Sequence, residues 1–391
     1  MTAGYTLRAT AITVVCVMPV FLVGGLAVQI GEELAFSPAG LGLAVAAYFA
    51  VSALTSVPAG VVVERYGART GARAGILLAA ACLLGIAVAA RGYPALVLLL
   101  AAGAAANGLG QLAANATLAA VPAHRQGLSF GIKQAAIPTA TLLAGASVPA
   151  VALTIGWRWA FAAAAAAALA TLALTPAAPA QTTGVRAGPA RTAPQRATGA
   201  LVVVGVAVAL AAASAGSLGT FLVDSAASRG VAPGVAGLTL TLGSTVCIAS
   251  RVGAGALVDR RRQRGDVGIV AVLLLTGAVG LALLAAPGTV ALIIGVLLGF
   301  GFGWVFPGLV NVAVVQLHPH APAAATSITQ TGVYAGGSVG PLAFGAAAAT
   351  AGYPVAWLAA ATGMLLAAGL MLLGRRLLHA HRAQLAAPAT R

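Results

Sequence analysis

The chain has 391 residues, of which 60% are hydrophobic and 7% are charged, and its formal net charge is +15. A soluble domain carries roughly a quarter charged residues, so this chain has too little polar surface to face water, and a soluble globular protein is excluded. Its basic residues lie in short clusters between long apolar runs, which is typical of membrane-protein loops and does not indicate a nucleic-acid-binding surface.

Twelve apolar segments are long enough to cross a bilayer, which needs about 20 residues per helix. Residues 179–198 are rich in Pro, Gly and Thr, and we predict a cytoplasmic linker there. The linker divides the chain into an N-terminal six-helix bundle (1–178) and a C-terminal six-helix bundle (199–378), followed by a cytoplasmic tail (379–391). The spans are expected at 10–30, 39–63, 72–91, 94–120, 129–154 and 158–178, and at 199–223, 234–258, 266–286, 289–316, 324–350 and 354–377.

The Lys and Arg residues indicate how these spans are oriented. With both termini in the cytoplasm, sixteen basic residues fall inside and only Arg91, Arg158 and Arg229 fall outside, while Lys133 and Arg251 lie within spans. Because cytoplasmic loops carry the excess of Lys and Arg, this distribution predicts a multi-pass protein of the plasma (inner) membrane with both termini cytoplasmic.

The second half of the chain repeats the first at an offset that slips from 195 to 196 residues. Each half has an even number of spans, so both halves enter the membrane from the same side. The sequence therefore predicts an all-α membrane protein with twelve transmembrane helices in two parallel six-helix repeats. The matching pairs are Pro38 and Pro233, Gly42 and Gly237, Gly60 and Gly255, Arg65 and Arg260, Asn115 and Asn311, Gln134 and Gln330, and Gly156 and Gly352.

Two loops at matching places in the halves share a motif. The loop after the second span reads Gly60-Val-Val-Val-Glu64-Arg65-Tyr66-Gly67-Ala68-Arg69, and the loop after the eighth reads Gly255-Ala-Leu-Val-Asp259-Arg260. They resemble the signature of the major facilitator superfamily: a glycine, three residues, an acid, a base, then glycine and further bases. The first copy has Ala68 where a base is usual, and the second lacks the later glycine. With twelve spans and a duplicated half, the resemblance covers essentially the whole chain.

The resemblance implies a gating role for the charged residues of these loops. A carboxylate beside arginines at a helix end can hold two helices together, and breaking that contact would release one half to rock against the other. The alternative is that these residues are solvated loop charges. Arg251 lies on the same helix face as Asp259 and would join this gate network or snorkel to the interface. The gating candidates are Glu64, Arg65, Arg69, Arg251, Asp259 and Arg260.

Polar side chains within the spans are the candidates for substrate binding. Lys133 lies about one turn inside the fifth span, where it would bind an anion or a carboxylate, or snorkel outward. Gln134 and Gln330 indicate a shared cavity or, alternatively, hydrogen bonds between helices. The resemblance implies that the fourth and tenth helices line the central path, which adds Asn107, Gln111, Asn115 and Asn311; structural pairing of these amides is the alternative.

Two further features bear on coupling and movement. Asp224, at the outer end of the seventh span, is the proton-coupling candidate; otherwise it is an interfacial charge. The eleventh span contains Gly336-x-x-x-Gly340-Pro341-x-x-x-Gly345, which resembles the glycine-proline motif that antiporters of this family carry on their fifth helix. Small residues allow close helix contact and proline allows a kink, so we expect a moving helix interface there.

The leading hypothesis is a secondary active transporter that moves a small solute by alternating access, driven by an ion or substrate gradient. A slight resemblance to cyanate-permease-type carriers rests on Gly108-Leu109-Gly110 and the acid-poor interior. The alternatives are a multidrug-type exporter of lipophilic compounds and a membrane receptor or scaffold that does not transport. The sequence contains no nucleotide-binding loop, metal cluster or nucleophile–base pair, so we expect no enzyme activity, cofactor or metal. The expected partners are a small-molecule substrate, the lipid bilayer and protons, with no nucleic acid, and the protein is expected to be a monomer.

Overall fold

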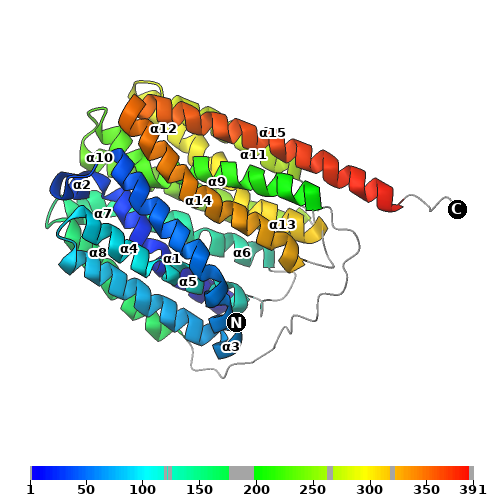
Figure 1. Cartoon of the computed structure of the whole chain (residues 1–391), viewed down its shortest axis with the longest axis horizontal. Coiled ribbons are helices and arrows are strands. Elements are labelled where there is room, and N and C mark those ends of the chain that lie inside the picture. The colour runs from blue at the N-terminus through cyan, green and yellow to red at the C-terminus, as the bar shows by residue number, and fades with distance from the viewer. Residues whose placement is uncertain are drawn as a thin grey trace.

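The computed structural model describes residues 2–118, 121, 126–175, 198–261, 267–317 and 322–386, and every element in these ranges is a helix (Figure 1). The first half contains α1 (Thr2–Gly25), α2 (Ala27–Leu34), α3 (Pro38–Ala89), α4 (Tyr93–Gly103), α5 (Ala105–Leu118), α6 (Gln126–Gln134), α7 (Ala136–Ser147), the π-helix η2 (Val148–Ala152), α8 (Trp157–Thr171) and the 3₁₀ turn η3 (Leu172–Leu174). The second half contains α9 (Thr198–Ala227), α10 (Pro233–Arg261), α11 (Val267–Leu283), α12 (Thr289–Leu298), the π-helix η4 (Gly299–Gly303), α13 (Phe306–Leu317), α14 (Pro322–Ala351) and α15 (Tyr353–Ala386).

These elements form the twelve transmembrane helices that the sequence predicts. Eight of the described helices are long and apolar enough to cross a membrane, and Gly268–Leu283 is a shorter apolar helix. The 52 residues of α3 would extend about 78 Å at 1.5 Å per residue, far more than one bilayer. The predicted spans 39–63 and 72–91 are thus one helix by hydrogen bonding, turned at Gly67, whose φ of 86° is a left-handed conformation that favours glycine.

Several crossings are interrupted rather than straight. The first consists of α1 and α2, the fourth of α4 and α5, and the fifth of α6, α7 and η2. The tenth is α12, η4 and α13. The break at Ala104 and the start of η4 at Gly299 lie at matching places in the two halves, 195 residues apart. Interrupted helices expose backbone carbonyls to side chains from neighbouring helices, and two such carbonyls recur below.

The helices alternate between two ends of the bundle, which we name the Gly67 end and the Gly156 end. The N-terminus of α1 and the C-terminal part of α15 lie toward the Gly67 end, and α2 lies at the other (Figure 1). Gly156 and Gly352 precede α8 and α15 with φ of 102° and 85°, so the turns at matching positions of the two halves share an unusual backbone conformation. The α15 helix continues to Ala386, beyond the predicted start of the tail, because residues 375–386 are mostly good helix formers.

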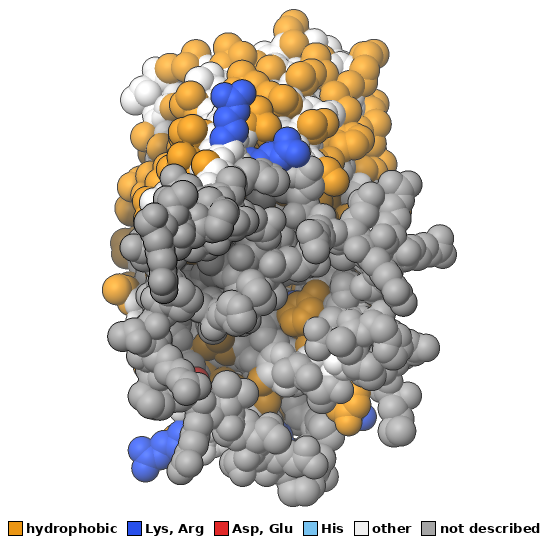
Figure 2. Space-filling view, turned by 90° about the vertical axis from the view of Figure 1, so that its right-hand side faces the viewer, with side chains coloured by type: hydrophobic (Ala, Val, Ile, Leu, Met, Phe, Trp, Pro, Cys, Tyr) orange, Lys and Arg blue, Asp and Glu red, His pale blue; other side chains and the backbone are white. Residues whose placement is uncertain are grey.

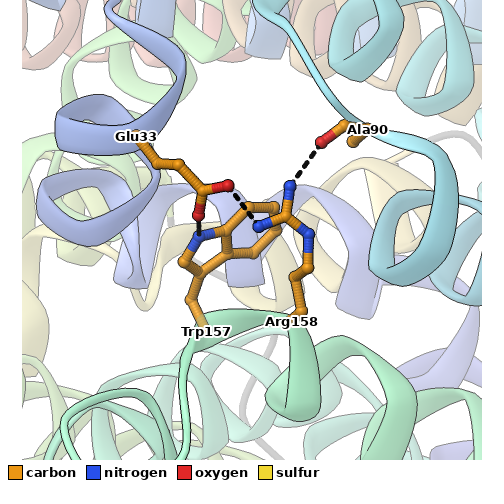
Figure 3. A network of polar contacts seen from close by, with 4 residues as sticks. All are labelled: Glu33, Ala90, Trp157 and Arg158. Carbon is orange, nitrogen blue, oxygen red and sulfur yellow. Dashed lines mark hydrogen bonds and ion pairs between the residues drawn. The ribbon is translucent and has the colours of Figure 1, made fainter.

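Each half is held together at the Gly156 end by an arginine that caps the end of a helix. In the first half Arg158 forms an ion pair with Glu33 and donates to the carbonyl of Ala90 at 2.7 Å, while Trp157 Nε1 donates to Glu33 at 2.6 Å (Figure 3). In the second half Arg229 donates to the carbonyl of Ala286 at 2.9 Å. Ala90 and Ala286 are repeat positions, so the same carbonyl is capped in both halves by arginines from different elements.

The two halves meet along two seams that are related by the repeat. In the first seam α3 packs against α14, and in the second α10 packs against α6 and α7. A contact between α1 and α9 lies between the seams. At the Gly67 end, Figure 2 shows Lys and Arg side chains at the rim of the described surface. The cavity described next lies between the two halves, within this frame.

Candidate functional site

A cavity of about 240 Å³ lies between the two halves. Drug-sized ligands occupy pockets of about 300–1,000 Å³, so this volume suits a small solute. Both halves contribute walls, from α1, α3, α5, α6 and α7 on one side and α9, α10, α13 and α14 on the other. Seven of the residues proposed from sequence line it: Asn107, Gln111, Asn115, Lys133, Gln134, Arg251 and Gln330.

The amides of α5 become more exposed along the helix. Asn107 is 3% exposed, Gln111 is half-buried, and Asn115 is exposed. Asn107 Nδ2 donates to Ser52 Oγ at 3.4 Å, and Ser52 Oγ donates to the carbonyl of Ala104 at 3.0 Å, at the break between α4 and α5. Since α5 runs toward the Gly67 end, the cavity is more accessible from that end than from the other.

Lys133 lies in the cavity wall, and its ammonium contacts another residue of that wall. Its side chain is 4% exposed, and Nζ donates a short hydrogen bond to Gln111 Oε1. This bond joins α6 to α5 within the first half. A snorkelling lysine would place its ammonium in water, whereas this one is directed at an amide in the cavity.

Arg251 is also buried, 4% exposed, and its guanidinium connects the two halves. Nη1 donates to the carbonyl of Gln134 on α6, and Nε donates to the carbonyl of Trp304 at 3.1 Å. The Gln134 carbonyl would normally accept from the N–H four residues later, but that residue is Pro138, which has none. Trp304 follows η4, where the tenth crossing is interrupted. Arg251 therefore satisfies two carbonyls that helix interruptions leave without helical partners.

The cavity is closed toward the Gly156 end by contacts between glycines and backbone. A Cβ on Gly145 would lie 2.5 Å from the carbonyl oxygen of Gly237, and one on Gly345 would lie 2.5 Å from that of Pro38. A Cβ on Gly42 would overlap the carbonyl oxygen of Pro341. Only glycine permits such close helix packing. Gly345 and Pro341 belong to the motif in the eleventh span, which therefore lies in an interface between halves.

Aromatic side chains, which no sequence pattern indicated, form much of the remaining wall. They are Phe21, Phe49, Phe130, Trp304, Phe306 and Tyr334. Phe21 and Trp304 pack edge to face with centroids 6.2 Å apart, across the two halves. In an apolar chain, an aromatic residue that faces a cavity cannot be told from one that faces lipid. The signal that could have found Trp304 and Phe306 is their position beside Pro307, after the run of glycines in 299–303.

Other proposed residues lie away from the cavity. Asp224 accepts a short hydrogen bond from Tyr353 Oη on α15 and is not among the lining residues. Glu64 and Arg65 are exposed at the Gly67 end, and Arg69 is half-buried. Within the described part of the chain the one ion pair is that of Arg158 with Glu33. The side chains of Asn311, Asp259 and Arg260 lie outside the described residues, so the gate network stays a prediction.

Chemically, the cavity combines two cations with several amides. None of the lining residues that the structure describes is Asp or Glu. The described residues also contain no group of three or more His, Cys, Asp or Glu placed to hold a metal ion. The arrangement can therefore bind and orient a polar solute through amide and cationic donors.

Comparison with known proteins gives the family and the fold. Residues 9–341 and 204–389 match the family model of the Major Facilitator Superfamily. Among curated proteins no sequence matches this chain. Of the solved structures that share the fold, a D-xylose-proton symporter is 19% identical with a TM-score of 0.72, and the match covers 94% of this chain and 96% of that one. A bacterial homologue of the human lysosomal transporter Spinster, in an inward-facing and unoccupied conformation, is 15% identical with a TM-score of 0.73, and the match covers 97% and 98%.

Proposed function

The chain belongs to the Major Facilitator Superfamily of membrane transporters, and from that premise we propose that it is a secondary active transporter that moves a small solute by alternating access. The observation that carries the proposal is the cavity between the two halves, which is closed toward the Gly156 end and more exposed toward the Gly67 end. In a carrier built from two repeats, rocking of one half against the other exposes a central site to each side in turn. The present arrangement is one of the two states that such a cycle requires.

We propose that the Gly67 end faces the cytoplasm and that the protein resides in the inner membrane. Arg8 near the start of α1, Arg65, Arg69 and Arg73 around Gly67, and the basic part of α15 support this orientation. The Gly156 end has few basic residues, and two of them, Arg158 and Arg229, are engaged with backbone carbonyls. The cavity would then be accessible from the cytoplasm, and the proposed gate residues would act when the Gly67 end closes in the opposite state. These residues are Glu64, Arg65, Arg69, Asp259 and Arg260.

The coupling of transport to an ion gradient is part of the proposal. Asp224 stays the proton-coupling candidate from sequence, although its hydrogen bond to Tyr353 and its absence from the cavity wall favour a structural role. The purified protein in liposomes would decide the matter. Labelled solutes should enter when a pH or solute gradient is imposed, and uptake should collapse when an ionophore dissipates the gradient.

The same experiment tests the alternative functions. Aromatic side chains in the wall favour a second candidate, an exporter of lipophilic compounds. That function predicts transport of several unrelated apolar compounds with little dependence on the polar residues of the cavity. A receptor or scaffold would bind solutes that never cross. If no solute in a broad panel crossed while ligands still bound, the transporter proposal would be wrong.

A further inference from the structure

The cavity holds two buried positive charges for which the described lining provides no negative partner. Lys133 and Arg251 are each 4% exposed. Lys133 donates to an amide oxygen, and Arg251 donates to two backbone carbonyls and contacts the buried thiol of Cys247; none of these groups is a carboxylate. A buried charge that lacks an opposite charge is costly, and within a membrane-spanning segment such a residue marks a functional site by default.

The acids whose side chains the structure describes do not compensate these charges. The chain has six Asp and Glu residues. Glu33 pairs with Arg158, and Glu32 is its exposed neighbour. Asp224 accepts from Tyr353, and Glu64 is exposed at the Gly67 end. Asp266 and the side chain of Asp259 lie outside the described residues, and Asp259 is eight residues beyond Arg251 on α10, or about 12 Å along the helix. The two cations thus face the cavity without a described carboxylate.

We propose that the missing negative charge is supplied by the solute, and that this cavity binds a small organic anion with a carboxylate group. The inference rests on the proposed function, because it names the solute class of the same cavity. Lys133 would provide the direct contact, since its ammonium has three N–H donors and forms one hydrogen bond to the described residues. Arg251 donates to the Gln134 carbonyl, one residue along the chain from Lys133, and adds positive potential at the same place.

The other walls favour an organic anion over an inorganic one. Phe21, Phe49, Trp304, Phe306 and Tyr334 present apolar ring surface to the cavity. A hydrated inorganic ion gains little from such a surface, whereas a hydrocarbon body loses contact with water there. The volume of about 240 Å³ limits that body to a small one. The amides of Asn107, Gln111 and Gln330 can hydrogen-bond further polar groups of the solute.

The test compares a carboxylate with its uncharged amide on the purified full-length protein. Benzoate and butyrate are paired with benzamide and butyramide, and nitrate serves as the inorganic anion. Binding is measured by equilibrium dialysis with labelled compounds. We expect at least one carboxylate to bind about tenfold or more tightly than its amide and than nitrate, because only the carboxylate neutralises the buried charge. This comparison needs no variant, so it holds even if a substituted protein folds poorly.

Variants then assign the preference to this cavity. Lys133→Gln should weaken carboxylate binding about tenfold or more and leave amide binding unchanged, while Lys133→Arg should keep the preference for the carboxylate. The matched control is Arg91→Gln, which removes a positive charge from an exposed position at the Gly156 end and should change neither.

The outcomes separate this inference from the proposed function. If carboxylates bind no better than amides, or if Lys133→Gln binds carboxylates as the unaltered protein does, the anion inference is wrong. A neutral solute that crosses liposomes regardless of Lys133 would overturn the inference and leave the transporter proposal standing. Carboxylates that bind through Lys133 but never cross would support the anion inference and overturn the transporter proposal.

Discussion

The two seams between the halves are repeats of one another, yet they differ at one end. Toward the Gly156 end, the overlap of Gly42 with Pro341 in the α3–α14 seam recurs as the contact of Gly237 with Gly145 in the α10–α7 seam. The hydrogen bond from Ser338 Oγ to the Ala46 carbonyl, at 3.1 Å, recurs as the one from Thr241 Oγ1 to the Leu142 carbonyl, at 3.5 Å. These pairs stand at offsets of 195 and 196, so both seams close this end in the same way.

Toward the Gly67 end the described contacts of the two seams differ. The α10–α6 seam continues through the bond from Arg251 to Gln134 and on to Gly131, where a Cβ would lie 3.2 Å from the Cα of Gly255. The repeat mates of Arg251 and Gln134 are Ser56 and Gln330. Ser56 Oγ donates to the carbonyl of Ala53 on its own helix, and Gln330 is exposed and lines the cavity.

This difference shows how one residue within a repeat changes the contacts between the halves. An arginine is long enough to reach from α10 to α6 and donate a hydrogen bond to a backbone carbonyl there. A serine is short and donates its hydrogen bond to a backbone carbonyl of its own helix. We infer that Arg251 keeps the α10–α6 seam joined beside the cavity.

The largest effect is expected from fixing the closed Gly156 end. With the native cysteines replaced, Cys pairs at Ala46 and Ser338, or at Thr141 and Ser244, should abolish transport once joined by an oxidant or a short thiol cross-linker, because both seams must open there in an alternating cycle. The Thr141 and Ser244 hydroxyls are 2.7 Å apart across the halves. Uptake before and after cross-linking, and after reduction, measures the effect.

A cross-link within one half is the matched control for this experiment. The Thr6 and Ser129 hydroxyls are 3.1 Å apart on α1 and α6, both in the first half. A Cys pair there should cross-link and leave uptake unchanged. If this pair also blocked transport, or if neither pair between halves did, the equivalence of the seams in the cycle would be refuted.

The next largest effect is expected at Gly42. In Gly42→Val the added side chain would overlap the Pro341 carbonyl, so α3 and α14 would have to move apart. We expect a loss of about 1–3 kcal/mol in stability, seen as a lower melting temperature, together with impaired uptake. Gly369→Val is the control, since nothing lies within 4 Å of a Cβ there. Equal melting temperatures for the two variants would contradict the close packing of this seam.

An effect of similar size is expected from Arg251→Ser, which gives the α10–α6 seam the residue of its repeat mate. The buried carbonyls of Gln134 and Trp304 would lose their donor, at a cost of about 1–3 kcal/mol. Spin labels at Phe130 and Leu257, exposed positions on α6 and α10, should report a longer and broader distance in the variant. Arg91→Ser is the control, and an unchanged distance in Arg251→Ser would show that the arginine does not hold the seam.

The smallest effect is expected at Glu33, which belongs to neither seam. Hydrogen bonds from Arg158 and Trp157 lower the pKa of its carboxyl. A lowered pKa in the folded state stabilises the protein at neutral pH, and this contribution is lost as the pH falls through that pKa. Because the Arg158–Glu33 ion pair is exposed, Glu33→Gln should lower the free energy of unfolding by less than about 1 kcal/mol at neutral pH and leave it unchanged at acidic pH. Melting curves at neutral and acidic pH, with Glu32→Gln as control, would measure this difference in stability. Equal losses of melting temperature at both pH values would contradict the prediction.

Much of the architecture could be predicted from the sequence because two signals there are strong. Apolar length determined the number of helices, and Gly156 with Gly352 marked turns that the structure confirms as equivalent. Six of the polar residues that line the cavity could be proposed as substrate-binding residues because a polar side chain inside a span is costly and therefore conspicuous. Arg251, the seventh, was expected in the gate network or at the membrane interface. The aromatic wall could not be proposed, since lipid and cavity are both apolar and no periodicity separates the faces that meet them.

The sequence by itself determined that this chain forms twelve helices in two parallel repeats, because apolar length and paired positions do not depend on how helices pack. Only the tertiary structure decided which end is closed and what holds it. The partner of Lys133 is an amide 22 residues earlier, and the partners of Arg251 are carbonyls 117 and 53 residues away. Such bonds exist only where helices cross and where a proline or a π-helix leaves a carbonyl unpaired. These bonds are properties of the packed bundle. They make the cavity asymmetric although the two halves of the sequence are repeats.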